Sequence, residues 1–203
     1  MSGLSERPLQ TPSNVLVDAS NVDDTGMLAC TRLLLEADLD RIGVVTVEHT
    51  PAEWDRQLRQ LPRRVPPVEY VDVETLARST SASTAGDRPS SVTTVADPED
   101  LTALGTAMDD LLQGNDERVG VCLHSISALL QFVEREPLFK FLHLMSERAR
   151  RAEALGAYYL DSTTSGAELR ALFSNLCEVV ATFDGEAFDL SSGKYASASA
   201  SAD

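Results

Sequence analysis

Six polar residues of this chain are of the types that carry out acid–base chemistry or hold ligands: Asp18, Glu48, His49, His124, Ser125 and Asp161. Each stands at or just beyond the carboxyl end of an apolar run that predicts a buried strand. In open α/β sheets, ligands bind beyond the carboxyl ends of the strands. We therefore expect these six side chains to form one candidate site at that edge of a sheet.

Several kinds of chemistry are open to this set. Glu48 could act as the base that activates a water molecule, and His49, His124 and Asp161 could hold a metal ion from three separate strands. Nucleophilic catalysis by Ser125 is not expected, because the sequence lacks the glycine-flanked elbow that exposes such a serine. Scattered His and Asp residues are commoner than metal sites, so we expect no metal and no cofactor here. Without a phosphate loop or a magnesium ligand Glu48 has nothing to attack, so we expect no catalytic residue.

The segment after the first predicted strand determines whether the chain can hold a nucleotide. A phosphate loop of the form GxxxxGK[ST] needs two glycines for close backbone approach, a lysine for phosphate charge and a hydroxyl for magnesium. The corresponding positions read ASNVDDTG, from Ala19 to Gly26. Asp24 and Thr25 replace the second glycine and the lysine, and Asp23 adds another carboxylate. A carboxylate ~4 Å from a phosphate costs about 1–4 kcal/mol, so we expect this loop not to bind ATP.

The composition is strongly acidic. The chain has 32 Asp and Glu residues against 17 Lys and Arg, a net charge of −15. This charge repels phosphate backbones and anionic lipids, so we expect a protein partner rather than direct binding to nucleic acid or membrane. Lysine occurs only at Lys140 and Lys194, and together with the acid excess this indicates adaptation to concentrated salt.

The spacing of the cysteines and the lengths of the apolar runs predict the cellular location of the protein. Cys30, Cys122 and Cys177 form no CxxC pair and have no metal-type spacing, which is typical of buried thiols in a reducing environment. The sequence shows neither a signal peptide nor a run long enough for a membrane span. A cytoplasmic location is therefore expected.

Strand-like and helix-like segments alternate along the chain. Strands are predicted over residues 14–18, 41–47, 68–73, 118–124, 156–160 and 178–183. Helices are predicted over residues 25–38, 50–61, 97–112, 127–155 (interrupted near Glu136 and Pro137) and 165–175. Thr50 and Glu53 predict a capping box at the start of the second helix. The alternation predicts an α/β protein with a mostly parallel sheet and helices on both faces, and the turn at Asp184 and Gly185 adds an antiparallel hairpin at the C-terminal edge.

The remaining segments are poor in large apolar residues. We expect residues 1–13 to be flexible, residues 79–91 (STSASTAGDRPSS) to form a mobile loop and residues 191–203 to form a disordered tail. A chain of 203 residues has room for one well-buried core. Residues 14–190 are therefore expected to form a single domain.

Residues 44–58 (VVTVEHTPAEWDRQL) resemble the second strand and following helix of RecA/KaiC-like proteins. In that family this segment contains a Glu-Glu-x-Pro run. Glu48 takes the first acidic position, which in the family polarises the attacking water, and His49 replaces the second acid.

Residues 119–132 (VGVCLHSISALLQF) resemble the Walker B strand of the same family, which ends Asp-Ser-Leu-Ser-x-Leu. Ser125, Ser127 and Leu129 match this motif. The aspartate linked to magnesium is replaced by His124.

Residues 154–163 (ALGAYYLDST) and 171–185 (ALFSNLCEVVATFDG) resemble the closing strands of the family, so the resemblance covers about residues 14–190. It is strongest to acidic KaiC-like chains of salt-loving archaea, some of them relatives of transducer or regulatory proteins. It implies a RecA/KaiC-like fold with a degenerate phosphate loop.

The function that the resemblance implies is that of a non-catalytic pseudo-ATPase. Such a protein would act as a protein-interaction or regulatory module in signalling or transcription control, as a homodimer or with a regulatory partner. One alternative is a divergent nucleotide hydrolase that uses Glu48 and His124. Another is a sensor that binds an uncharged or cationic small ligand in the strand-end site.

Overall fold

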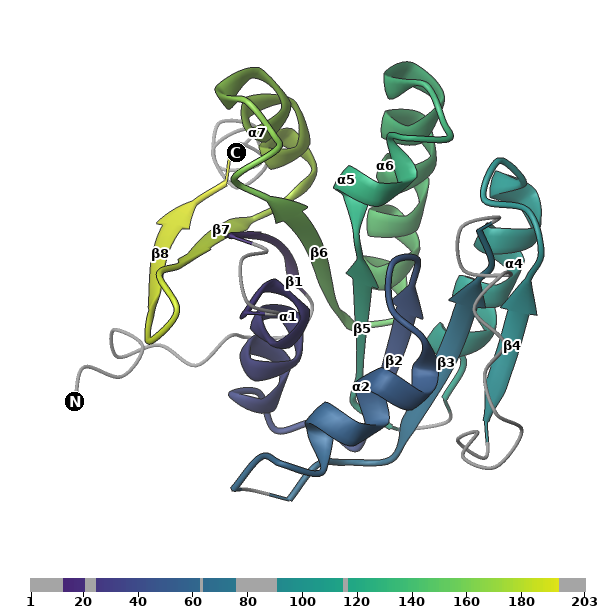
Figure 1. Ribbon diagram of the computed structural model, residues 1–203, viewed down its shortest axis with the longest axis vertical. Helices are drawn as coiled ribbons and strands as arrows, with labels where there is room; N and C mark the ends of the chain where they lie inside the picture. The colour runs from purple at the N-terminus through teal and green to yellow at the C-terminus, as the bar shows by residue number, and fades with distance from the viewer. Residues whose placement is uncertain (1–12, 21–24, 63, 76–90, 115–116, 194–203) are drawn as a thin grey trace.

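The computed structural model describes residues 13–20, 25–62, 64–75, 91–114 and 117–193. Within these ranges, eight strands form one sheet in the order β4-β3-β2-β5-β6-β1-β7-β8 (Figure 1). The strands are β1 (Ser13–Ala19), β2 (Arg41–Thr46), β3 (Val68–Val73), β4 (Val92–Val95), β5 (Val119–His124), β6 (Leu155–Asp161), β7 (Val179–Phe183) and β8 (Phe188–Ser192). All neighbouring strands are parallel except β7 and β8, which are antiparallel. The predicted fold class, with its antiparallel C-terminal edge, is confirmed.

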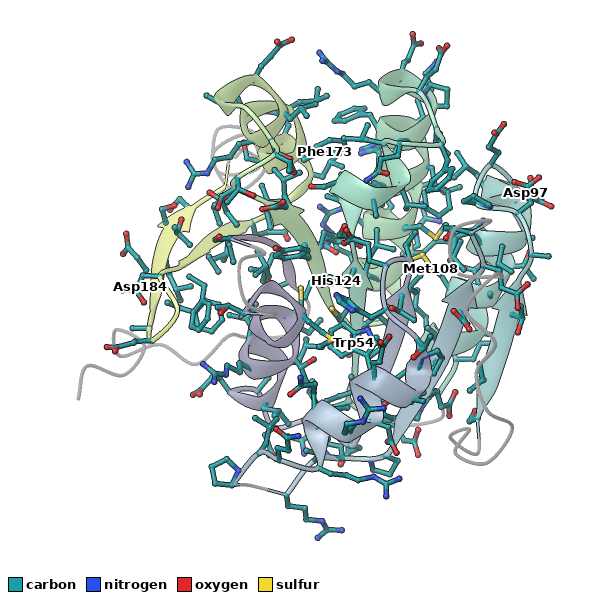
Figure 2. All side chains as sticks on the ribbon, in the orientation of Figure 1. Trp54, Asp97, Met108, His124, Phe173 and Asp184 are labelled. Atoms are coloured by element: carbon teal, nitrogen blue, oxygen red, sulfur yellow. The ribbon has the colours of Figure 1, made fainter. Side chains whose placement is uncertain are left out.

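The helices cover both faces of the sheet. They are α1 (Thr25–Leu35), α2 (Pro51–Leu58), α4 (Leu101–Leu112), α5 (Ile126–Leu129), α6 (Arg135–Arg151) and α7 (Ala167–Phe173), the last continued by the 3₁₀ turn η2 (Ser174–Leu176). Apolar side chains of α1 and α2 pack on one face, and those of α4 to α7 pack on the other. Figure 2 shows Trp54 in the first of these two cores and Met108 and Phe173 in the second.

The central strands are buried on both faces, which explains their continuous apolar sequences. Every residue of β1, β2, β5 and β6 is buried. Side chains alternate between the two cores along each strand, as Val121 and Cys122 do on β5. This alternation decides which side chains at the strand ends can meet.

Side chains cap the starts of α2 and α4, and the cap of α2 is the one that the sequence predicts. At the start of α2, the Glu53 amide donates to Thr50 Oγ1 (3.2 Å) and the Thr50 amide donates to Glu53 Oε2 (2.7 Å), which forms the capping box. Asp100 caps α4 by accepting from the amides of Thr102 and Ala103. These side chains satisfy amides that have no partner within the helix.

The structure differs from the sequence prediction at several boundaries. Strand β4 was not predicted, and α2 ends at Leu58 rather than near residue 61. The break in the long helix lies at residues 130–134, ahead of the expected position, because Pro137 fits in the first turn of α6, where its missing amide costs no helical hydrogen bond. Strand β8 includes Ser191 and Ser192, which the prediction placed in the tail, because both pair with β7.

The predicted flexible segments fall almost wholly outside the described residues. Of the N-terminal segment only Ser13 is described, and it is the first residue of β1. Of the 79–91 loop only Ser91 is described, and residues 194–203 of the tail are outside. Among the described residues, no helix combines the length and apolar character needed to cross a bilayer.

Candidate functional site

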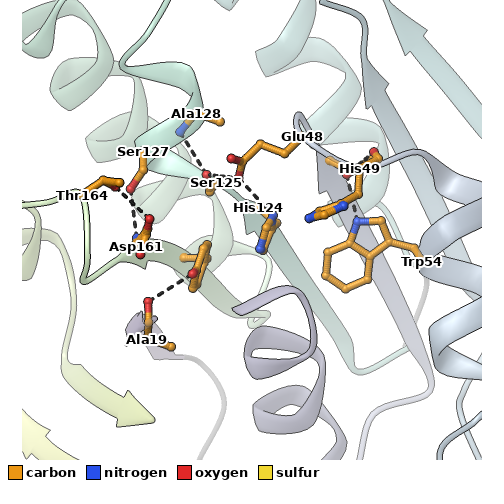
Figure 3. Close-up of polar contacts among 12 residues, drawn as sticks. Ala19, Glu48, His49, Trp54, His124, Ser125, Ser127, Ala128, Asp161 and Thr164 are labelled. Atoms are coloured by element: carbon orange, nitrogen blue, oxygen red, sulfur yellow. Dashed lines mark hydrogen bonds and ion pairs between the residues drawn. The ribbon is translucent and has the colours of Figure 1, made fainter. Parts of the chain in front are cut away.

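The sheet brings the ends of four central strands to one edge. Thr46 at the end of β2 pairs with His124 at the end of β5, and the Val47 amide donates to the His124 carbonyl oxygen (2.9 Å). Strand β6 lies next to β5 and ends at Asp161, which pairs with Ala19 at the end of β1. Figure 3 shows the side chains that this arrangement collects.

His124 lies at the centre of the group, on the face covered by α1 and α2. Its ring is fully buried and stacks on Tyr159, with ring centroids 4.3 Å apart and planes 3° from parallel. The Trp54 ring meets it edge-on at 5.4 Å, and the His49 ring lies 5.6 Å away at 52°. His124 is thus held by three other rings.

This environment keeps the His124 imidazole neutral. Burial, with a smaller contribution from His49, lowers the pKa of His124 from 6.5 to about 3. The backbone of His124 itself, the backbone of Gly26 and the Asp161 carboxylate oppose this shift. Neither ring nitrogen of His124 has a hydrogen-bond partner within the described residues. A buried polar atom without a partner is unusual in a folded protein.

Glu48 and Ser125 form the outer part of the group. Ser125 Oγ donates to Glu48 Oε2 (3.0 Å) and accepts from the Ala128 amide (3.0 Å), because Ser125 is the N-cap of α5. Glu48 Oε2 also lies 3.9 Å from His124 Nδ1, too far for a hydrogen bond. Ser125 is fully buried, so a substrate cannot reach its hydroxyl. A cis peptide bond joins His124 to Ser125.

His49 is oriented by its neighbours on β2 and α2. Thr46 Oγ1 donates to the His49 carbonyl oxygen (2.6 Å) and accepts from Trp54 Nε1 (2.9 Å). These bonds fix the backbone of the turn after β2 and the indole behind it. The Nε2 atom of His49 is buried and, like the nitrogens of His124, has no partner in the described part of the chain.

Asp161 is engaged in the turn that follows β6. Its Oδ1 accepts from the amide and the hydroxyl of Thr163 (2.9 and 2.8 Å), and its Oδ2 accepts from Thr164 Oγ1 (2.9 Å). Its amide donates to Ser127 Oγ (2.9 Å), which also bonds with Ser165 Oγ. The carboxylate therefore stabilises the loop between β6 and α7.

Asp18 does not join this group. Its two flanking residues, Val17 and Ala19, belong to the core under α1, so by alternation Asp18 faces the opposite side of the sheet. There its carboxylate binds Arg170 Nε on α7 (2.5 Å), and Arg170 also donates to Thr182. The prediction that all six strand-end side chains share one site is therefore wrong for Asp18.

The segment from Ala19 to Gly26, which the sequence predicts to be a degenerate phosphate loop, is described only at its ends. The Ala19 carbonyl oxygen accepts from Tyr159 Oη (3.1 Å) and from the Ser162 amide (2.9 Å). Thr25 begins α1, and Gly26 is buried. Asp23 and Asp24 lie outside the described residues.

The described residues include no cluster of three or more His, Cys, Asp or Glu side chains that could hold a metal ion. The alternative metal site at His49, His124 and Asp161 therefore has no support, because Asp161 is bound to threonines and His124 is enclosed by rings. Sequence reasoning missed Tyr159 and Trp54 as parts of the site. For Tyr159 the available signal was its spacing two residues before Asp161, which places both on the same face of β6.

Comparison with protein families gives a match over residues 12–183, to a family of unknown function, DUF7504. The chain belongs to this family. A search of curated proteins finds no match.

Among the solved structures similar to this chain are three proteins from archaea. One is the subject of a structural study of PH0250 from Pyrococcus horikoshii OT3, with a TM-score of 0.61, 13% identity and coverage of 92% of this chain and 89% of that chain. Another is the uncharacterized protein PH0321 from Pyrococcus horikoshii in complex with an unknown peptide, with a TM-score of 0.59, 13% identity and coverage of 86% and 78%. The flagellar accessory protein FlaH from Methanocaldococcus jannaschii matches with a TM-score of 0.47, 14% identity and coverage of 89% and 76%.

At this level of identity the likeness is one of fold. Together with the strand order, in which β6 lies between β1 and β5, it shows that this DUF7504 member has a RecA/KaiC-like α/β fold.

Proposed function

We propose that this protein is a RecA/KaiC-like pseudo-ATPase that acts as a protein-interaction or regulatory module in signalling or transcription control. The observation that carries the proposal is the neutral, enclosed imidazole of His124. By resemblance, this residue takes the position of the magnesium-linked aspartate of RecA/KaiC-like proteins. A neutral imidazole packed between Tyr159, Trp54 and His49 offers no negative charge to Mg²⁺, which prefers carboxylate and water oxygens.

The other acidic groups near the strand ends support the same conclusion. Asp161 is bound to threonine donors and Asp18 to Arg170, so both carboxylates are already engaged. Glu48 retains the position of the water-polarising acid, but its Oε2 accepts from the buried Ser125 hydroxyl. Without a phosphate-binding lysine or a magnesium ligand, Glu48 has no bound phosphate against which to direct a water molecule.

The net charge of −15 supports the choice of partner. It favours association with a basic protein surface and disfavours nucleic acid. We further propose that the protein is cytoplasmic and works as a homodimer or in complex with a regulatory protein.

The test is a thermal denaturation series with 1 mM Mg-ATP in high salt, combined with a phosphate-release assay. We expect no shift and no turnover. The measurement is sensitive, because ATP at a hundredfold excess over its Kd would stabilise the fold by about 2.7 kcal/mol. Saturable stabilisation together with turnover that is lost in Glu48→Gln would instead support the divergent hydrolase.

A small-ligand sensor is the second candidate. It is favoured by three imidazole nitrogens of His49 and His124 that have no hydrogen-bond partner within the described residues, because a ligand with donors and acceptors would satisfy them. Stabilisation by a neutral or cationic metabolite in the same thermal assay, without any ATP effect, would favour the sensor over the interaction module.

A further inference from the structure

Helix α6 lies between α4 and α7 in the helix layer that covers one face of the sheet (Figure 1). One side of the helix is buried, and its flanks are engaged by neighbouring elements. Arg148 pairs with Asp109 on α4, and Arg150 pairs with Glu178 just before β7. With 3.6 residues per turn, the side opposite the buried one carries a stripe about 100° wide. The residues of this stripe, all exposed except the half-buried Glu147, are Glu136, Lys140, His143, Leu144, Glu147 and Arg151.

The stripe carries an apolar side chain in a neutral setting. Leu144 is 47% exposed, although most large apolar side chains of the described structure are buried. With histidine neutral, its two acids and two bases give the stripe no net charge, on a chain whose net charge is −15. Glu136 and Lys140 bond to each other (2.6 Å), but an exposed pair contributes little, so both side chains can turn to a new partner at low cost. A second molecule of the same charge therefore meets less repulsion here than on the acidic parts of the surface.

The charges of the stripe are complementary to the same charges read in the opposite direction. The outer pair, Glu136 and Arg151, and the inner pair, Lys140 and Glu147, are each centred on the same point of the chain, just before Leu144. A two-fold axis through this point would place each acid against a base of a second copy, and each contact would occur twice. The two Leu144 side chains would meet near the axis. A parallel pairing in register would instead place like charges against each other, which is unfavourable.

We propose that this stripe of α6 is a dimer interface, packed antiparallel against the same stripe of a second copy of the chain. This inference rests on the proposed role as an interaction module and names both the surface and the partner. Helix α6 has 17 residues and is about 25 Å long, so one pair of such helices, with axes about 8–10 Å apart, buries less area than a standard interface. The dimer should therefore be weak and should form at high protein concentration.

The test measures self-association of the full chain by sedimentation velocity, at the lowest KCl concentration at which circular dichroism shows the parent and all variants to be folded. The mass of the parent should rise from monomer to dimer as its concentration increases. Arg151→Glu should weaken the dimer about tenfold or more, because it places two carboxylates together at both ends of the symmetric contact. Arg56→Glu is the matched control, since it makes the same change at an exposed position of α2 on the other face of the sheet. This control should dimerise as the parent does.

A charge exchange tests the pairing itself. Glu136→Lys combined with Arg151→Glu has the net charge of the parent and restores an acid opposite each base, so it should recover the affinity that Arg151→Glu alone loses. Recovery also excludes misfolding as the cause of the loss. Equal losses in Arg151→Glu and Arg56→Glu would reduce the effect to net charge. That result, or a failure of the exchange to restore the dimer, would overturn the proposal.

The direction of the two helices is tested by a distance. Pro137→Cys introduces an exposed thiol for a spin label, and the native cysteines do not compete because all three are buried. In the antiparallel dimer the two labelled positions lie about 20 Å apart along the helix axes, whereas in a parallel dimer they face each other at about 10 Å. Pulsed electron paramagnetic resonance separates the two cases, and the shorter distance would contradict the proposed interface.

Two further outcomes keep this inference apart from the proposed function. If the chain remains a monomer at every concentration while Mg-ATP has no effect, the inference fails and the pseudo-ATPase proposal stands. If Mg-ATP is hydrolysed, the proposed function fails whether or not the dimer forms.

Discussion

The buried histidine at the end of β5 should make the protein sensitive to mild acid. The pKa of His124 is about 3 in the folded chain, against 6.5 for a solvent-exposed histidine, because burial disfavours the charged ring. Between these two values the unfolded chain binds a proton at this site and the folded chain does not. Acid therefore favours the unfolded state: the free energy of unfolding falls as pH falls below 6.5, and above 6.5 nothing is lost.

The size of the effect follows from the two pKa values. Each pH unit within this window lowers the free energy of unfolding by about 1.4 kcal/mol. Lowering the pH from 7 to 5 should therefore reduce it by about 2 kcal/mol through His124 alone. His124→Phe removes the titrating group and keeps an aromatic ring to stack on Tyr159. Since it also removes two nitrogens that have no hydrogen-bond partner in the described part of the chain, we expect its stability at pH 7 to lie within about 1 kcal/mol of the parent.

The assay is urea denaturation of the parent and His124→Phe at pH 7 and pH 5 in the same salt. The chain has 32 acidic residues that also respond to pH, but they are common to both proteins and cancel in the difference. His143→Phe provides the control, because His143 is exposed on α6 and its loss leaves the buried cluster intact. Between pH 7 and pH 5, the free energy of unfolding of His124→Phe should rise by about 2 kcal/mol relative to that of the parent. If the difference in free energy of unfolding between the two proteins stayed constant, or if the parent became relatively more stable at pH 5, His124 would be charged in the folded state and paired with Glu48. That result would refute the reasoning.

Three further predictions follow from the same structure. His124→Asp, which restores the acid of the related Walker B strand, should destabilise the fold by about 3–5 kcal/mol at pH 7 in urea denaturation, because the carboxylate would be buried near Glu48 without a cation; a change below 1 kcal/mol would contradict this. Thr50→Ala should cost about 1 kcal/mol in thermal denaturation through loss of the capping box, whereas Thr50→Ser should retain it, and equal losses would argue against the cap. Finally, circular dichroism should show a melting temperature that rises from 10 mM to molar KCl, because repulsion within the net charge of −15 extends over ~30 Å at the lower concentration and over only ~3 Å at the higher one; equal values would remove the argument for salt adaptation.

The strands of the central sheet were predictable because their signal is local. Residues 118–124 and 156–160 are short apolar runs, which a strand buried on both faces requires, and β5 and β6 formed there. The capping box at Thr50 was predictable for the same reason, since its partners are three residues apart. Strand β4 was missed because its sequence, VTTV, is short and half exposed at the sheet edge, where little apolar pattern is needed.

The membership of the site was predictable only in part. Parallel strands end at a common edge, so the sequence alone placed Glu48, His49, His124, Ser125 and Asp161 in one region. The face that each side chain takes depends on the pairing and packing of the strands. Ala19 packs in the core under α1, whereas its neighbour Asp18 faces the opposite side of the sheet and pairs with Arg170.

The chemical state of the site was decided by tertiary structure alone. From its resemblance to the Walker B strand, the sequence predicts that His124 takes the position of an aspartate, and residues 19–26 lack the lysine and glycines of a phosphate loop. It could not determine that Tyr159 from β6 and Trp54 from α2 would enclose the ring, because these residues lie 35 and 70 positions away from His124 in the chain. Enclosure removes water from the imidazole, and loss of hydration is what holds it neutral.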